Sequence, residues 1–137
     1  MCSINRDRRV IEDQMQIESD AMLRELEQGV DAMPWGLSLF KDTWHQGVVG
    51  LLASRVKERF HRPVVAFARE NPGVLKGSGR SIPGFHMRDA LDAVATANPG
   101  LVSKFGGHAM AAGLSLAEDS LDAFCQAFDA VVRARLE

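Results

Sequence analysis

Residues 105–113 read Phe-Gly-Gly-His-Ala-Met-Ala-Ala-Gly, so this stretch of backbone carries very little side chain. Glycine adopts positive φ and leaves peptide N–H groups uncovered. Gly106 and Gly107 ahead of His108 can therefore form a concave set of donors for an anion such as phosphate. The alternative is a tight turn that leads into a strand whose small residues pack under a helix. A glycine pair by itself does not separate these two interpretations.

A second set of polar groups ends a predicted strand at residues 76–81, Lys-Gly-Ser-Gly-Arg-Ser. Small residues flank Arg80, and the hydroxyls of Ser78 and Ser81 lie close to it in the sequence. A forked guanidinium with two neutral donors beside open backbone suits a phosphodiester. The alternative is a surface arginine at a flexible strand end.

His45 is a third candidate, because it lies where a helical spacing of apolar residues begins. Asp42 or Thr43 can cap this helix, which places Trp44 and His45 in its first turn. Free N–H groups and the helix dipole favour anions at that position. His45 is therefore predicted either to meet a phosphate or to make a capping or packing contact.

The elements that position these residues alternate between helices and strands. In order, they are a polar helix from Asn5 to about Gln28, a strand over 36–40, a helix ending at residue 60, strands over 64–68 and 74–81, a helix over 86–97, a strand over 111–116 and a final helix capped by Ser120. This order predicts an α/β domain with a single mixed sheet of four to five strands flanked by helices, preceded by a long connector helix. The boundary is expected between Gly29 and Pro34, which separates residues 1–33 from a compact domain over 34–137.

Composition is that of an ordinary soluble domain, with 46% hydrophobic and 25% charged residues among 137. A net charge of −2 excludes a general attraction to polyanions, so any such site must be a local cluster. Cys2 and Cys125 are expected to be buried or incidental thiols, which suits a reducing cytoplasm. With no membrane-length apolar run and no leader pattern in the sequence, we expect a cytoplasmic protein with no membrane partner.

The sequence offers no set of catalytic or metal-binding side chains. The four histidines fall in separate predicted elements, with no His/carboxylate spacing typical of a metal site. No Ser/His/Asp order, Cys/His pair or Walker-type loop is present either. We therefore expect a chain that binds its substrate without cleaving it, with no catalytic residues and no metal ligands.

Three stretches together resemble the DHH-associated domain of the RecJ family, the bacterial single-stranded-DNA-specific exonucleases of the DHH phosphoesterase superfamily. They follow the family's order and comprise residues 44–50 with 53–55, residues 76–85, and residues 105–108 with 111–113. The helix around residues 5–8 is similar to the segment that joins the family's catalytic domain to this one. The resemblance implies that residues 1–33 are a connector from a catalytic domain missing here and that residues 34–137 are a nucleic-acid-binding domain.

The resemblance also implies that seven residues contact the phosphate of single-stranded DNA. They are Gly106, Gly107 and His108 of a glycine-histidine motif, Ser78, Arg80 and Ser81 of a second group, and His45. The parent enzyme would hold Mn2+ or Mg2+ in its N-terminal catalytic domain, the partner of this chain in cis. That enzyme would degrade single-stranded DNA from the 5′ end in DNA repair and recombination. This fragment alone is expected to be inactive.

Other functions stay open. Small DHH phosphodiesterases acting on short RNA or nucleotides and alanyl-tRNA synthetases share the glycine-histidine motif, so the chain is alternatively half of such a phosphodiesterase. A further alternative is a non-catalytic docking module in which the glycine motif serves as a hinge. The Trp-His-x-Gly-Val-Val-Gly helix start and the Ser-Ile-Pro-Gly-Phe turn favour RecJ.

Overall fold

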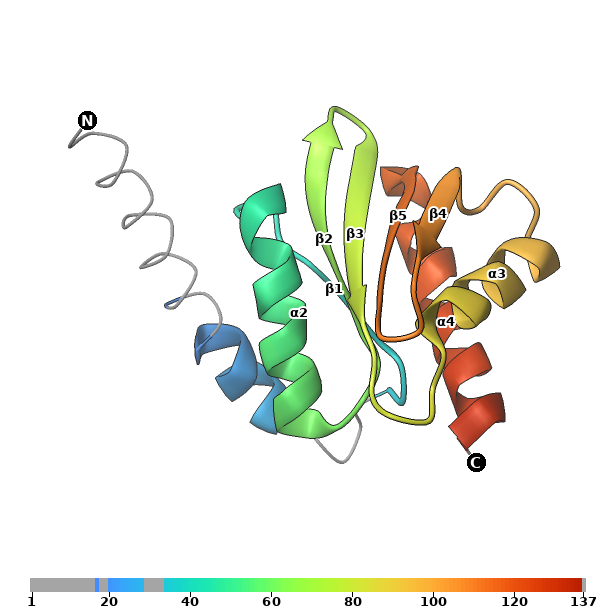
Figure 1. Cartoon of the computed structure of the whole chain (residues 1–137). Helices are drawn as coiled ribbons and strands as arrows, with labels where there is room; N and C mark the ends of the chain where they lie inside the picture. The colour runs from blue at the N-terminus through green and yellow to red at the C-terminus, as the bar shows by residue number, and fades with distance from the viewer. Residues whose placement is uncertain (1–16, 18–19, 29–33, 137) are drawn as a thin grey trace. The chain divides into compact units, whose positions relative to one another are not determined.

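The computed structural model describes residues 17, 20–28 and 34–136 of the chain (Figure 1). The chain divides into two compact units, Met1–Met33 and Pro34–Glu137. In the first unit residues 20–28 are helical, as predicted for this part of the chain. Most of that predicted helix lies outside the described residues.

The second unit contains one five-stranded sheet and its covering helices. Its elements are, in order, β1 (Leu37–Phe40), α2 (Gln46–Phe60), β2 (Val64–Asn71), β3 (Val74–Arg80), α3 (Met87–Ala97), β4 (Lys104–Gly107), β5 (Ala111–Ala117), the short 3-10 helix η2 (Glu118–Ser120) and α4 (Leu121–Leu136). The strand order is β1-β2-β3-β5-β4. β1 pairs with β2 in parallel and the other pairs are antiparallel, so the predicted mixed sheet flanked by helices is confirmed. No helix in the described part of the chain is long and apolar enough to cross a membrane.

Helix α2 begins later than its sequence predicts. The Trp44 N–H donates to Lys41 O at 3.1 Å, which closes a turn, and the Trp44 side chain is buried. His45 is the N-cap, with an extended backbone at φ −101° and ψ 148°, and its carbonyl accepts the Val48 N–H. The prediction that Trp44 and His45 lie in the first helical turn was wrong, because burial of the indole holds the chain in a turn just before the helix.

The glycine pair belongs to a strand that the sequence pattern did not predict. Gly106 and Gly107 end β4, which pairs with β5, and residues 108–110 form the connection between the two strands. Four residues with two glycines have low strand propensity. Pairing with β5 overrides this low propensity and provides the fifth strand of the sheet.

The two faces of the sheet are covered differently. Helices α3 and α4 pack on one face, and α2 packs on the other against β2 and β3 (Figure 1). Because side chains alternate along a strand, Leu75 and Gly77 of β3 face α3 and α4 together with Leu114 and Leu116 of β5. This face carries the larger hydrophobic core.

Three fully buried phenylalanines join α4 to the sheet. Phe67 of β2 meets Phe124 edge to face with ring centroids 5.5 Å apart, and Phe124 stacks on Phe128 at 5.6 Å. Gly77 makes room for this arrangement, because a Cβ there would lie 2.6 Å from Phe67 Cε1. A hydrogen bond from Gly36 N to Asp129 Oδ1, 3.0 Å long, ties the start of β1 to the same helix.

Removing the central ring should weaken the whole domain. We expect Phe124→Ala to lower the free energy of unfolding by about 3–5 kcal/mol, because it leaves a cavity between two aromatic partners. Urea denaturation followed by circular dichroism measures this change. Gln126→Ala, on the exposed side of the same helix, should change stability by less than about 0.5 kcal/mol. Equal decreases for the two variants would contradict the central position of Phe124 in the core.

Candidate nucleic-acid interface

Part of the α2 face of the sheet is open, because no described element of the second unit covers β5 and β4 there. Alternate residues of three strands point to this face. The strand registers align them in rows, each given from β3 through β5 to β4: Lys76, Ser115 and Lys104; then Ser78, Gly113 and Gly106. The last row is Arg80 with Ala111, whose carbonyl accepts the backbone N–H of His108 in the turn after β4. The structure thus brings four of the predicted site residues, from segments 26 or more positions apart, to adjacent positions of one surface.

Arg80 lies between the sheet and helix α2. A Cβ at Gly50 would lie 2.7 Å from Arg80 Nη2 and 4.0 Å from Ser78 Oγ, so the guanidinium and the hydroxyl meet the helix at the point where it has no side chain. Arg80 Nη1 donates to Gly79 O at 2.8 Å. Among the described residues no carboxylate forms a salt bridge with Arg80. No described carboxylate therefore neutralises its charge.

The two glycines of the motif serve different structural purposes. Gly107 has φ +136°, and a Cβ there would lie 2.5 Å from Ala112 Cα and 2.6 Å from Ala111 O, so glycine is required. A Cβ at Gly106 would meet nothing within 4 Å. Gly107 therefore shapes the end of β4, whereas Gly106 keeps the open surface free of side chains.

His108 follows Gly107 at the edge of this surface. Its backbone N–H donates to Ala111 O at 2.7 Å, which holds the 108–110 turn closed, and its side chain is exposed. The imidazole is therefore accessible at the end of the row that begins with Arg80. It can donate or accept a hydrogen bond there.

Ser81 lies under this surface and not on it. Its side chain is fully buried, and its hydroxyl donates to Phe85 O at 2.6 Å. Its backbone N–H donates to Met110 O at 2.9 Å. In this structure Ser81 joins two turns and presents no group to a ligand, unlike the direct phosphate contact expected from the sequence.

His45 is placed by helix α2, apart from the three rows. Its side chain is exposed and makes no capping hydrogen bond, and the first turn of the helix contains no acidic residue. Gly50 follows His45 by five positions, which is about 7.5 Å along a helix axis. Because α2 packs on the face of the sheet that carries Arg80, His45 lies on the same side of the domain.

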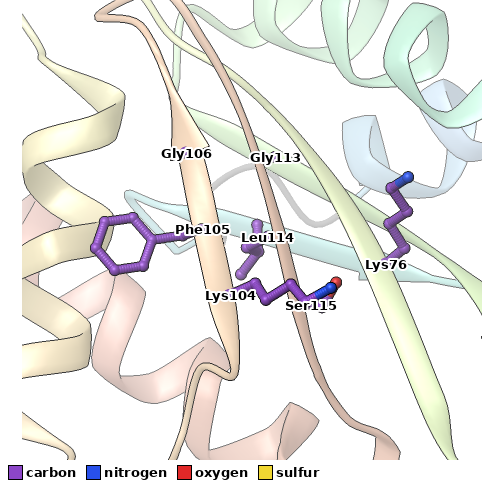
Figure 2. Close-up of a pocket in the computed structure, with 7 residues that line it drawn as sticks. All are labelled: Lys76, Lys104, Phe105, Gly106, Gly113, Leu114 and Ser115. Atoms are coloured by element: carbon purple, nitrogen blue, oxygen red, sulfur yellow. The ribbon is translucent and has the colours of Figure 1, made fainter.

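Two lysines on this surface were not predicted from the sequence. Lys76 on β3 and Lys104 on β4 are the two ends of the row through Ser115, and a hollow of about 290 Å3 lies between them over Gly106, Gly113 and Ser115. Figure 2 shows Lys104 extending toward Ser115. The sequence did indicate that these lysines belong to the surface. Each lysine precedes a predicted site residue by two positions, and strand alternation puts residues two positions apart on one face.

The described residues contain no group of three or more His, Cys, Asp or Glu side chains that could hold a metal ion. The Mn2+ or Mg2+ that the resemblance implies therefore does not fit the described part of this chain. In α4, burial raises the pKa of the Cys125 thiol, which disfavours the reactive thiolate. Cys2 lies outside the described residues.

Residues 32–134 match the DHHA1 domain family. The chain belongs to this family. The chain is 59% identical over 126 residues to the single-stranded-DNA-specific exonuclease RecJ of Dickeya dadantii (strain 3937), covering 92% of this chain and 22% of the relative. It is 56% identical over 135 residues to the RecJ protein of Escherichia coli (strain K12), covering 98% and 23%. The chain thus spans less than a quarter of the length of these relatives.

The fold of the DHHA1 domain agrees with the sequence comparison. It is similar to the crystal structure of RecJ from Thermus thermophilus in complex with Mg2+, with a TM-score of 0.70 and 31% identity. The match covers 89% of this chain and 18% of that chain. The predicted resemblance to the RecJ family is confirmed, and the chain is a RecJ-like DHHA1 domain.

The different positions of the two motif glycines can be tested by stability measurements. We expect Gly107→Ala to destabilise the domain by about 1–3 kcal/mol, because it combines positive φ with a collision against backbone atoms. Gly106→Ala should change stability by less than about 1 kcal/mol, since its methyl group enters open space. Thermal unfolding of both variants provides the comparison. Similar effects at the two positions would contradict the assigned roles.

Proposed function

We propose that this chain is the substrate-binding part of a RecJ-like single-stranded-DNA exonuclease and that its open sheet surface holds the phosphate backbone of the strand. The observation that carries the proposal is the Arg80 guanidinium beside the Ser78 hydroxyl, with no carboxylate partner among the described residues. An unneutralised guanidinium with a neighbouring hydroxyl is a strong binding group for a phosphate oxygen.

The glycines next to Ser78 determine how closely a strand can approach. Gly113 and Gly106 continue the Ser78 row across β5 and β4, so a polynucleotide backbone meets peptide groups there instead of side chains. His108 supplies a further polar group from the turn at the end of β4. All of these groups suit phosphate or sugar oxygens, and contacts of this kind position a strand without reading its bases. We therefore expect binding without sequence preference.

Hydrolysis is assigned to other parts of the parent protein. The relatives are described as single-stranded-DNA-specific exonucleases, and this chain covers 22% and 23% of their lengths. In this proposal an N-terminal catalytic domain, joined in cis through residues 1–33, holds Mn2+ or Mg2+, which activates water for attack on the 5′-terminal phosphodiester. The DHHA1 domain binds and orients that substrate. A cytoplasmic location and a role in DNA repair and recombination belong to the same proposal.

Arg80→Ala tests the phosphate site directly. Removal of a charge-assisted hydrogen-bonding group should weaken binding of labelled single-stranded oligothymidylate by about tenfold or more in fluorescence anisotropy. The slope of log K against log salt should become shallower by about 0.7 for each phosphate that the variant no longer neutralises. Arg88→Ala, at an exposed position of α3 on the other face, is the charge-matched control. Unchanged affinity for Arg80→Ala, or an equal decrease for Arg88→Ala, would contradict the proposal.

The same assay separates the alternative functions. Preference for short RNA over single-stranded DNA would favour an RNA or nucleotide phosphodiesterase. If His108→Ala and Arg80→Ala both left binding unchanged, a docking module would be the better interpretation. Degradation of DNA by the purified chain with Mn2+ would show that catalysis is not confined to a missing domain.

The proximity of Arg80 to α2 gives a prediction in which stability and binding change in opposite directions. Gly50→Ala should stabilise the helix by up to about 1 kcal/mol. Because the new methyl group displaces the guanidinium, affinity for single-stranded DNA should fall by about tenfold. Gly47→Ala adds a methyl group to open space in the same helix and should leave affinity unchanged. Urea denaturation and anisotropy measure both quantities, and undiminished affinity in Gly50→Ala would show that the guanidinium position is unimportant.

A further inference from the structure

We infer that the hollow between Lys76 and Lys104 is a second phosphate-binding subsite, which takes the phosphate adjacent to the one held by Arg80 and Ser78. The inference rests on the proposed function, since both subsites would lie along one polynucleotide. It extends that function from a single anion contact to a path across the sheet.

The register of the sheet brings the two lysines to opposite sides of one residue. Lys76 on β3 and Lys104 on β4 are both register partners of Ser115 on β5. Their Cα atoms are therefore two strand spacings apart, about 10 Å. Two flexible four-carbon stems can bring both ammonium groups to one anion above the Ser115 hydroxyl. Figure 2 shows the Lys104 side chain already directed to that side of β5.

The charges of this hollow are not balanced by the domain. Both lysines are exposed, and no salt bridge joins either of them to a carboxylate of the described residues. Figure 2 shows the Lys76 side chain directed away from Lys104 and Ser115, and bringing both ammonium groups to the hollow of about 290 Å3 would cause mutual repulsion unless an anion lay between them. A bound phosphate would remove this repulsion, and the Ser115 hydroxyl would donate a further hydrogen bond to it.

The distance between the subsites suits neighbouring phosphates of one strand. Lys76 precedes Ser78 by two residues on β3, which is about 7 Å along a strand. That is close to the separation of successive phosphates in an extended single strand. Gly113 and Gly106 are in the row of Ser78 and line the hollow, and they carry no side chain, so the sugar between the phosphates can pass over them. Lysines act here as point charges, which suits a backbone-tracking groove without base preference.

The experiment compares two ligands on the full chain. Thymidine 5′-monophosphate carries one phosphate and can occupy only one subsite at a time, whereas 5′-phosphorylated trithymidylate can span both. We expect the double substitution Lys76→Ala with Lys104→Ala to lower the affinity for trithymidylate by about tenfold. It should also reduce the slope of log K against log salt for this ligand by about 0.7, while the affinity for the monophosphate changes little. Arg80→Ala should lower the affinity for both ligands. Chemical-shift titration of backbone amides measures both affinities.

The controls separate this inference from the proposed function. Arg88→Ala with Arg135→Ala removes the same charge from exposed positions of α3 and α4, and should have little effect on either ligand. Lys76→Arg with Lys104→Arg should retain trithymidylate binding. Equal weakening of trithymidylate by the two charge-removing pairs would indicate long-range electrostatics and overturn the second subsite. The second subsite would also be overturned if the double lysine substitution left trithymidylate affinity unchanged while Arg80→Ala lowered it. That result would leave the first phosphate site intact.

Discussion

The Arg80 guanidinium can lie between helix α2 and β3 only because residue 50 has no side chain. A Cβ at Gly50 would lie 2.7 Å from Arg80 Nη2, so a larger residue would have to expel the guanidinium from the corner between helix and sheet. In that corner the cation has one hydrogen bond to Gly79 O and no carboxylate partner among the described residues. The open surface therefore has a fixed positive group at one edge, beside the glycine row that starts at Ser78.

The two faces of the sheet are built differently. On the face of α3 and α4, the stacked and edge-on contacts of Phe124 are fully buried. On the opposite face, α2 covers β2 and β3, and β5 and β4 present glycine, serine and lysine. Gly77 and Gly106 illustrate the difference. The absence of a side chain at Gly77 makes room for the Phe67 ring in the core, whereas Gly106 leaves its part of the open surface without a side chain. The open surface therefore contributes less to the hydrophobic core than the opposite face does.

Much of this protein was determined by local sequence patterns. Apolar periodicity and turn residues predicted the α/β class, the mixed sheet and the bounds of β3 and α3 to within one residue, because these features depend on neighbours in the chain. The same patterns identified Ser78, Arg80 and the glycine-histidine motif as candidate phosphate-binding groups. Their combination in one order also identified the family, which no single motif could have done.

Only the tertiary structure decided which of these groups share a surface. Strand alternation tells which residues lie on one face, but the placement of β5 between β3 and β4 depends on long-range pairing that no local pattern encodes. That pairing aligned Lys76 with Lys104 across Ser115. Burial decided which polar and aromatic side chains near the turns are accessible, because a hydroxyl or an indole near a turn can point to solvent or to the core. Ser81 and Trp44 both point inward, and so Ser81 became a support for the surface and the start of α2 moved to Gln46.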